Sequence, residues 1–152
     1  MKYILVLMSL VMLAPSASIA ADDGMISKKS PHSVKVTLDR LENVLRKKGI
    51  TIVTRWSHDA GAKKVGIALR PTELLIFGNP KMGSHFFTSK QTAGIDLPMK
   101  ALAWKDDKGQ VWLTYNDPSY ISNRHGINDR EKIKNKMTGA LNKLTNVAIG
   151  NK

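Results

Sequence analysis

The chain has 152 residues, with 24 Lys plus Arg against 12 Asp plus Glu, a net charge of +12, and no cysteine. The lack of cysteine excludes disulfides, thiol catalysis and cysteine-ligated iron–sulfur clusters. This length suffices for one ordinary domain with its own hydrophobic core. The basic charge could direct the protein to anionic partners, although lysines scattered over several elements are ordinarily a solvated surface.

The first twenty residues have the pattern of a secretory signal peptide. Lys2 precedes an apolar run from Tyr3 to Ala14, and Ser18-Ile19-Ala20 places small residues where signal peptidase reads them. We therefore expect cleavage after Ala20 and a periplasmic or secreted protein. The alternative is a membrane anchor, but a spanning helix needs about 20 apolar residues, and Pro15 ends this shorter run. No transmembrane segment is expected after cleavage.

Residues 21–152 are predicted to form a single domain with its core at about 25–148. A first strand is expected at Met25–Lys29. A helix should follow, capped by Ser33 and ended by Gly49. Its apolar residues recur at helical spacing: Val34, Leu38, Leu41 and Leu45.

Four more strands and a second long helix are expected further along the chain. The strands are predicted at 50–56, 73–77, 99–104 and 111–115, the last two joined by a tight turn at Asp106–Gly109. A short helix at 60–65, a looser and partly helical segment at 81–94, and chain breaks at Asn116–Pro118 and near Gly126 separate them. The final helix should begin with a capping box of Asn128 and Glu131 and bury Ile133, Met137, Leu141 and Leu144.

The element order β-α-β-β-β-β-α predicts a two-layer α+β fold. Strands without long crossovers favour an antiparallel sheet, here five-stranded, and the two long helices would cover one face of it. Apolar residues on the opposite face, such as Trp104, Trp112 or Phe77, would then need a second copy, a ligand or a partner to cover them.

Four motifs together resemble one known family. Ser57-His58-Asp59-Ala60, Leu74–Lys81 (Leu-Leu-Ile-Phe-Gly-Asn-Pro-Lys), Asp96-Leu97-Pro98 and Tyr115-Asn116-Asp117-Pro118 are similar to the domain of unknown function 302. The resemblance spans nearly all of residues 21–152. It implies a curved antiparallel sheet with helices on one side, similar to the TATA-binding-protein-like group, and often a dimer. It implies neither DNA binding nor any established activity.

Candidate catalytic residues centre on His58 and Asp59. An imidazole beside a carboxylate can act as a general base near neutral pH, and Tyr115 and Asp117 at the end of the fifth strand could assist it. The alternatives are structural: Asp59 would cap a helix, and Asn116 with Asp117 would form an Asx-type turn before the following proline.

Candidate ligand-binding residues are Gly78, Asn79, Lys81, Arg124 and His125. The first three could present backbone amides and one positive charge to an anion, although a strand-to-helix turn also explains them. Arg124 and His125 follow the fifth strand and could converge with His58 at one rim of the sheet.

No cofactor and no metal site are expected. P-loop and dinucleotide fingerprints are absent, and His32, His58, His85 and His125 lack the paired spacing of a zinc site. Met82 and His85 offer a single soft pair, but methionine more often fills a core. Nucleic acid is not an expected partner, because no basic run is interleaved with stacking aromatics.

The leading functional hypothesis is a non-enzymatic homodimer in the periplasm that binds a small ligand or a protein. One alternative is a hydrolase-like or other enzyme that uses His58 as acid or base. Another is binding of the basic surface to anionic envelope surfaces.

Overall fold

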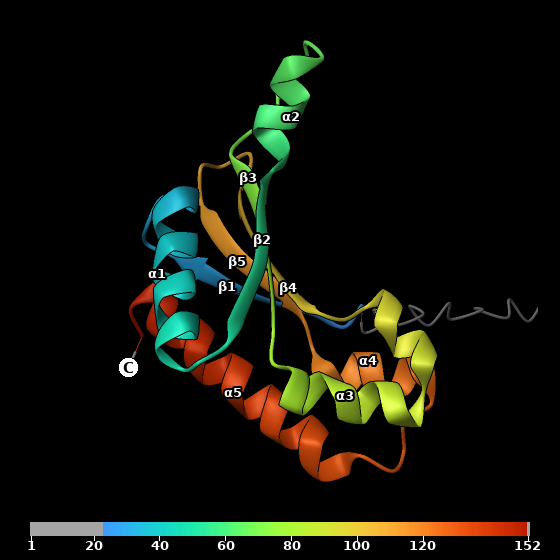
Figure 1. Ribbon diagram of the computed structural model, residues 1–152. Coiled ribbons are helices and arrows are strands. Elements are labelled where there is room, and N and C mark those ends of the chain that lie inside the picture. Colours follow the sequence, from blue (N-terminus) through green and yellow to red (C-terminus); the bar gives the residue numbers. More distant parts are fainter. Residues whose placement is uncertain (1–22, 152) are drawn as a thin grey trace, which may run out of the picture.

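The computed structural model describes residues 23–151, so the predicted leader and its cleavage site after Ala20 lie outside the described residues. Five strands form one antiparallel sheet in the order β1-β5-β4-β3-β2 (Figure 1). They are β1 (Met25–Ser30), β2 (Thr51–Ser57), β3 (Thr72–Gly78), β4 (Met99–Lys105) and β5 (Val111–Asn116). The predicted α+β fold with a five-stranded antiparallel sheet is confirmed.

Helix α1 (Val34–Lys47) forms where the apolar spacing predicts it. Ser33 Oγ accepts a hydrogen bond from the backbone N–H of Val36 at 3.3 Å and so caps the first turn. Gly49 follows the end of the helix and has φ +68°, a left-handed conformation that glycine adopts without strain. The apolar stripe is fully buried against the sheet: Leu38, Leu41 and Leu45.

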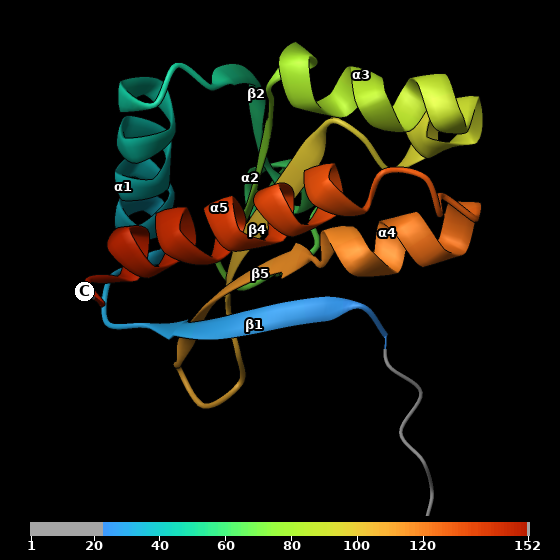
Figure 2. The same ribbon diagram turned by 90° about the horizontal axis from the view of Figure 1, so that it is seen from below.

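Helix α5 (Glu131–Ile149) lies beside α1 on the same face of the sheet (Figures 1 and 2). Arg40 joins the two helices, because its Nε donates to the backbone carbonyl of Ala148 at 2.7 Å. Between these helices and the sheet lies the core. The sheet contributes buried residues from its three central strands: Leu75, Phe77, Ala101, Ala103, Leu113 and Tyr115.

Three helical segments were predicted only in part or not at all. Helix α3 (Pro80–Ser89) and the 3₁₀ turn η1 (Gln91–Ile95) occupy the segment expected to be loose, and α4 (Pro118–His125) replaces an expected break. Asp117 caps α4 and proline occupies its first turn, so residues that stop a strand also start a helix. The predicted capping box of Asn128 and Glu131 is wrong, since α5 starts after Arg130 without a side-chain cap.

Helix α2 (His58–Lys64) and the chain that follows it project beyond the end of the sheet (Figure 1). We call residues 58–71 the arm. Every residue from 63 to 70 is exposed. The arm carries Val65, Ile67 and Leu69 at 72%, 61% and 48% exposure, together with three basic residues and no acidic residue after its first turn.

Among residues 23–151, no helix combines the length and the apolar character needed to cross a membrane.

Candidate functional site

The face of the sheet opposite α1 and α5, which we call the open face, is lined by apolar side chains. Alternate residues of β4 are buried under the helices, so Leu102 and Trp104 between them lie on the open face. The strand register pairs Leu102 with Leu74, and Leu74 with Trp56, in one row across three strands. Trp104 pairs with Trp112. All three tryptophans of the chain therefore lie on this face.

Hydrogen bonds hold two of these indoles in place. The rings of Trp104 and Trp112 stack with centroids 6.4 Å apart. Trp104 Nε1 donates to Thr114 Oγ1 at 2.9 Å, and Trp112 Nε1 donates to Asp106 Oδ2 at 2.8 Å. The bond from Trp112 lowers the pKa of Asp106. Because the N–H groups are satisfied within the chain, the rings present apolar surface rather than unpaired donors.

No helix within residues 23–151 lies over the centre of the open face (Figure 1). Trp56 is 59% exposed, and the other apolar side chains of the face are partly exposed. Trp104 and Trp112 thus lie on the uncovered side, whereas Phe77 faces the helices and is buried. The open face is the strongest candidate for a binding surface on a sheet of this kind.

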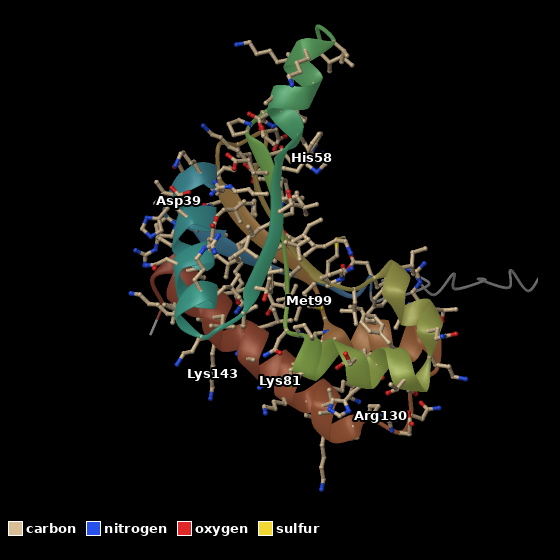
Figure 3. All side chains as sticks on the ribbon, viewed as in Figure 1. Asp39, His58, Lys81, Met99, Arg130 and Lys143 are labelled. Atoms are coloured by element: carbon tan, nitrogen blue, oxygen red, sulfur yellow. The ribbon has the colours of Figure 1, made fainter. Side chains whose placement is uncertain are left out.

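His58 and Asp59 begin the arm (Figure 3) and take part in a helix cap. Ser57 Oγ accepts from the N–H of Ala60 at 3.0 Å and donates to Asp59 Oδ1 at 2.8 Å. The same carboxylate oxygen accepts from the N–H of Thr72 at 3.3 Å. Desolvation raises the pKa of Asp59, but these hydrogen bonds outweigh it and the pKa is lowered. The carboxylate is thus engaged by the turn rather than by the imidazole.

Tyr115 and Asp117 lie at a distance from His58. Tyr115 points into the helix layer, and burial raises the pKa of its phenol. Asp117 Oδ1 accepts from the N–H of Ser119 at 2.8 Å and from the hydroxyl of Thr138 at 3.3 Å. Strands β3 and β4 separate β5 from β2, which leads into His58. The structure does not bring the four candidate catalytic residues together.

Gly78, Asn79 and Lys81 form the turn from β3 into α3. Asn79 Oδ1 accepts from the N–H of Lys81 at 3.0 Å, and its carbonyl accepts two further N–H bonds at 2.9 Å from the first turn. The amides of this turn are therefore engaged in capping the helix. A Cβ on Gly78 would lie 3.2 Å from Cβ of Pro98, so close packing favours glycine at this position.

Arg124 and His125 end α4, where they meet a carboxylate that follows η1. His125 Nε2 lies 2.7 Å from Asp96 Oδ2, and its Nδ1 lies 3.0 Å from Thr92 Oγ1. Arg124 Nη1 donates to the other Asp96 oxygen at 3.0 Å. The imidazole and the carboxylate are 7% and 10% exposed.

This cluster has the order of a nucleophile–base–acid triad, with an exposed hydroxyl, an imidazole and a carboxylate in series. If Nε2 donates to Asp96, Nδ1 is free to accept from the Thr92 hydroxyl. His125 is thus better organised for acid–base chemistry than His58. Thr92 carried no sequence signal, and the only sign of Asp96 was its place in the Asp-Leu-Pro motif.

Two adjoining hollows lie where the ends of β3 and β4 meet α3 and α5, near Met99 (Figure 3). Their volumes are about 240 Å³ and about 210 Å³. They share a wall formed by Gly78, Asn79, Met82, Met99 and Met137. Two of the predicted ligand-binding residues, Gly78 and Asn79, therefore line a cavity, whereas Lys81 lines neither hollow.

The four histidines lie on separate elements: His32 before α1, His58 on α2, His85 on α3 and His125 on α4. Within the part of the chain that the structure describes, no three His, Cys, Asp or Glu side chains are grouped so that they could hold a metal ion.

Comparison with known proteins gives relatives that are longer than this chain. The chain is 46% identical over 127 residues to the Fluoride-specific ion channel FluC 1 of Brucella suis biovar 1 (strain 1330), a match that covers 82% of this chain and 50% of that relative. The FluC 1 of Brucella abortus biovar 1 (strain 9-941) matches with the same identity and is covered to 47%. The chain thus spans about half the length of the curated relatives it matches.

A solved structure shares the fold. It is described as an uncharacterized conserved protein DUF302 from Bacillus stearothermophilus, and it aligns with a TM-score of 0.75 at 16% identity, covering 83% of this chain and 98% of that chain. The family model for the Domain of unknown function DUF302 matches residues 26–144. The four motifs, the sheet with helices on one face and this match agree, and the chain belongs to the DUF302 family.

Proposed function

We propose that the protein is a non-enzymatic binding domain that works in the periplasm as a homodimer, with the open face as the surface between the two copies. The observation that carries this proposal is the position of all three tryptophans on a face that no helix of residues 23–151 covers. An exposed apolar sheet face is a liability for a soluble domain unless it is covered.

A second copy fits this face because a two-fold axis brings identical patches together. Five strands about 4.8 Å apart, with about six residues each at about 3.4 Å, give a face of roughly 500 Å². Two such faces bury roughly 1,000 Å², near the lower limit for a specific interface. Cleavage after Ala20 removes Lys2, the only charged residue of the leader, so the net charge falls from +12 to +11, and this charge on each copy adds repulsion. We therefore expect a weak dimer that dissociates on dilution.

The tryptophans provide a direct test. Covering the open face should shift their emission to shorter wavelength, and the shift should rise with protein concentration together with the mass measured by sedimentation. Leu102→Glu places a charge at the centre of the face and should keep the protein monomeric. Trp56→Ser, at a 59% exposed position, should weaken the dimer without harming the fold.

The matched control is Val147→Glu, which adds the same charge at a 50% exposed position on α5, outside the open face. It should dimerise like the unmodified protein. A protein that stays monomeric at every concentration, or a Leu102→Glu variant that remains folded and still dimerises, would overturn the proposal.

The relatives support a second candidate function, in which this domain accompanies a fluoride channel. The match covers only about half of proteins named as fluoride-specific ion channels, so the matched half can have a task separate from conduction. Deleting the gene should then make cells more sensitive to fluoride and leave sensitivity to chloride unchanged. Unaltered growth in fluoride would reject this candidate.

A further inference from the structure

We propose that the two hollows beside Met99 form one binding site for a single-chain amphiphile with a carboxylate head, such as a medium-chain fatty acid. The site is independent of the homodimer proposed above, because its walls contain none of the three tryptophans of the open face.

The walls suit an alkyl chain. The first hollow adds Phe87, Leu97 and Pro98 to the shared wall, and the second adds Ile50, Phe77, Leu141 and Leu144. Neither volume alone reaches the roughly 300 Å³ at which ligand pockets begin, but the two together do. Three methionines in the shared wall separate the hollows. Because their side chains are unbranched and flexible, they can move aside and let one chain occupy both.

The rim determines the head group. Among residues 23–151, Lys48 and Lys136 are the only ionisable side chains that line either hollow. Lys48 directly follows α1, and Lys136 lies on α5. Both side chains are exposed, and within residues 23–151 neither ammonium group forms an ion pair or a hydrogen bond. Two unpaired cations beside an apolar hollow favour a carboxylate and repel a cationic head.

The probes are dodecanoate, dodecanol and dodecylammonium, titrated into the purified full chain by calorimetry below their micellar concentrations. We expect dodecanoate to bind most tightly and dodecylammonium least. Shortening the carboxylate by one methylene at a time should weaken binding about fourfold per step while the chain still fits the hollow. Equal binding of the three head groups, or no binding of dodecanoate, would overturn the proposal.

Two variants locate the site. Ala140→Trp places a large ring in the second hollow from an exposed position on α5 and should abolish binding. Lys48→Gln with Lys136→Gln should weaken dodecanoate about fivefold and leave dodecanol unchanged. The matched control is Lys47→Gln with Lys143→Gln, which removes two exposed lysines from the same two helices outside the hollow.

If Ala140→Trp binds dodecanoate normally, the chain lies elsewhere and the proposal is wrong. Leu102→Glu, which tests the dimer, should bind dodecanoate like the unmodified protein. Failure of the dimer and failure of this site are therefore distinguished by separate variants.

Discussion

Replacing Arg55 with methionine should remove the main polar connection between β2, β3 and α1. Its Nε donates to Glu73 Oε2 at 2.7 Å, and its Nη1 donates to Asp39 Oδ1 at 2.6 Å. Its Nη2 also donates to the backbone carbonyl of Lys35 at 3.2 Å. The side chains of Arg55 and Glu73 are 22% and 19% exposed, whereas that of Asp39 is 43% exposed. The contact with Glu73 is therefore largely withdrawn from water, and the contact with Asp39 is partly screened.

The magnitude follows from that exposure. A fully exposed ion pair contributes about 0–1 kcal/mol, whereas a buried hydrogen bond to a charged group contributes about 1.5–3 kcal/mol. Two such contacts in a partly screened site lie between these limits. We therefore expect Arg55→Met, which keeps most of the aliphatic packing, to reduce the free energy of unfolding by about 2 kcal/mol.

The loss should depend on pH. Hydrogen bonds from Lys35 and then from Arg55 lower the pKa of Asp39 in the folded protein. A carboxylate with a lowered folded pKa stabilises the fold above its unfolded pKa of about 3.9, and this contribution is lost as pH falls through the folded value. The difference between the unmodified protein and Arg55→Met should therefore be largest at neutral pH and shrink below about pH 4.

Urea denaturation followed by circular dichroism, at neutral and at acid pH, measures both effects. Arg46→Met is the matched control, because Arg46 bonds Glu42 at 2.7 Å while its own side chain is 61% exposed. This control should cost less than about 1 kcal/mol. The reasoning is refuted if Arg46→Met costs as much as Arg55→Met, or if the cost of Arg55→Met is the same at both pH values.

Three other outcomes test the arm, the histidine cluster and one glycine. If the basic protein binds anionic envelope surfaces, replacing Val65, Ile67 and Leu69 with serine should reduce its co-sedimentation with phosphatidylglycerol vesicles. The control Ile95→Ser, at a 72% exposed site on η1, should not reduce it. Unchanged binding of the triple variant would show that the arm has no part in membrane binding. His125→Gln should lower the melting temperature because it breaks the hydrogen bond to Asp96, and His58→Gln should leave the melting temperature unchanged. If the protein hydrolyses esters and only His125→Gln loses this activity, His125 has a role in acid–base chemistry instead. Gly24→Ala should cost more than about 1 kcal/mol of stability, because Gly24 has φ +70° and the ring of Tyr120 fills the space of a Cβ; an unchanged melting temperature would contradict this packing.

Local patterns were sufficient for the elements with strong periodicity. The leucines of α1 and the alternating residues of β4 and β5 make each element recognisable from neighbouring residues alone. Helix α4 was missed because Asn116, Asp117 and Pro118 serve equally well to end a strand and to cap the next helix. The same residue types therefore occur at strand ends and at helix starts, and the packing of the following chain decides which of the two forms.

The candidate sites depended on contacts between distant segments. Thr92 and His125 are 33 residues apart, and only the packing of η1 against α4 brings them together. The hollows form where α3, α5 and two strand ends meet. No pattern within one segment encodes such a meeting, because it results from how the segments pack.

By itself the sequence determined the family, the fold class, the two long helices and the strands, since these depend on motifs and on the spacing of apolar residues along short stretches of chain. Only the tertiary structure decided that Trp56, Trp104 and Trp112 share one face and that His58 lies far from Tyr115. The physical reason is that strand order and register are set by pairing across the whole sheet. That pairing assigns each side chain to the helices or to the open face.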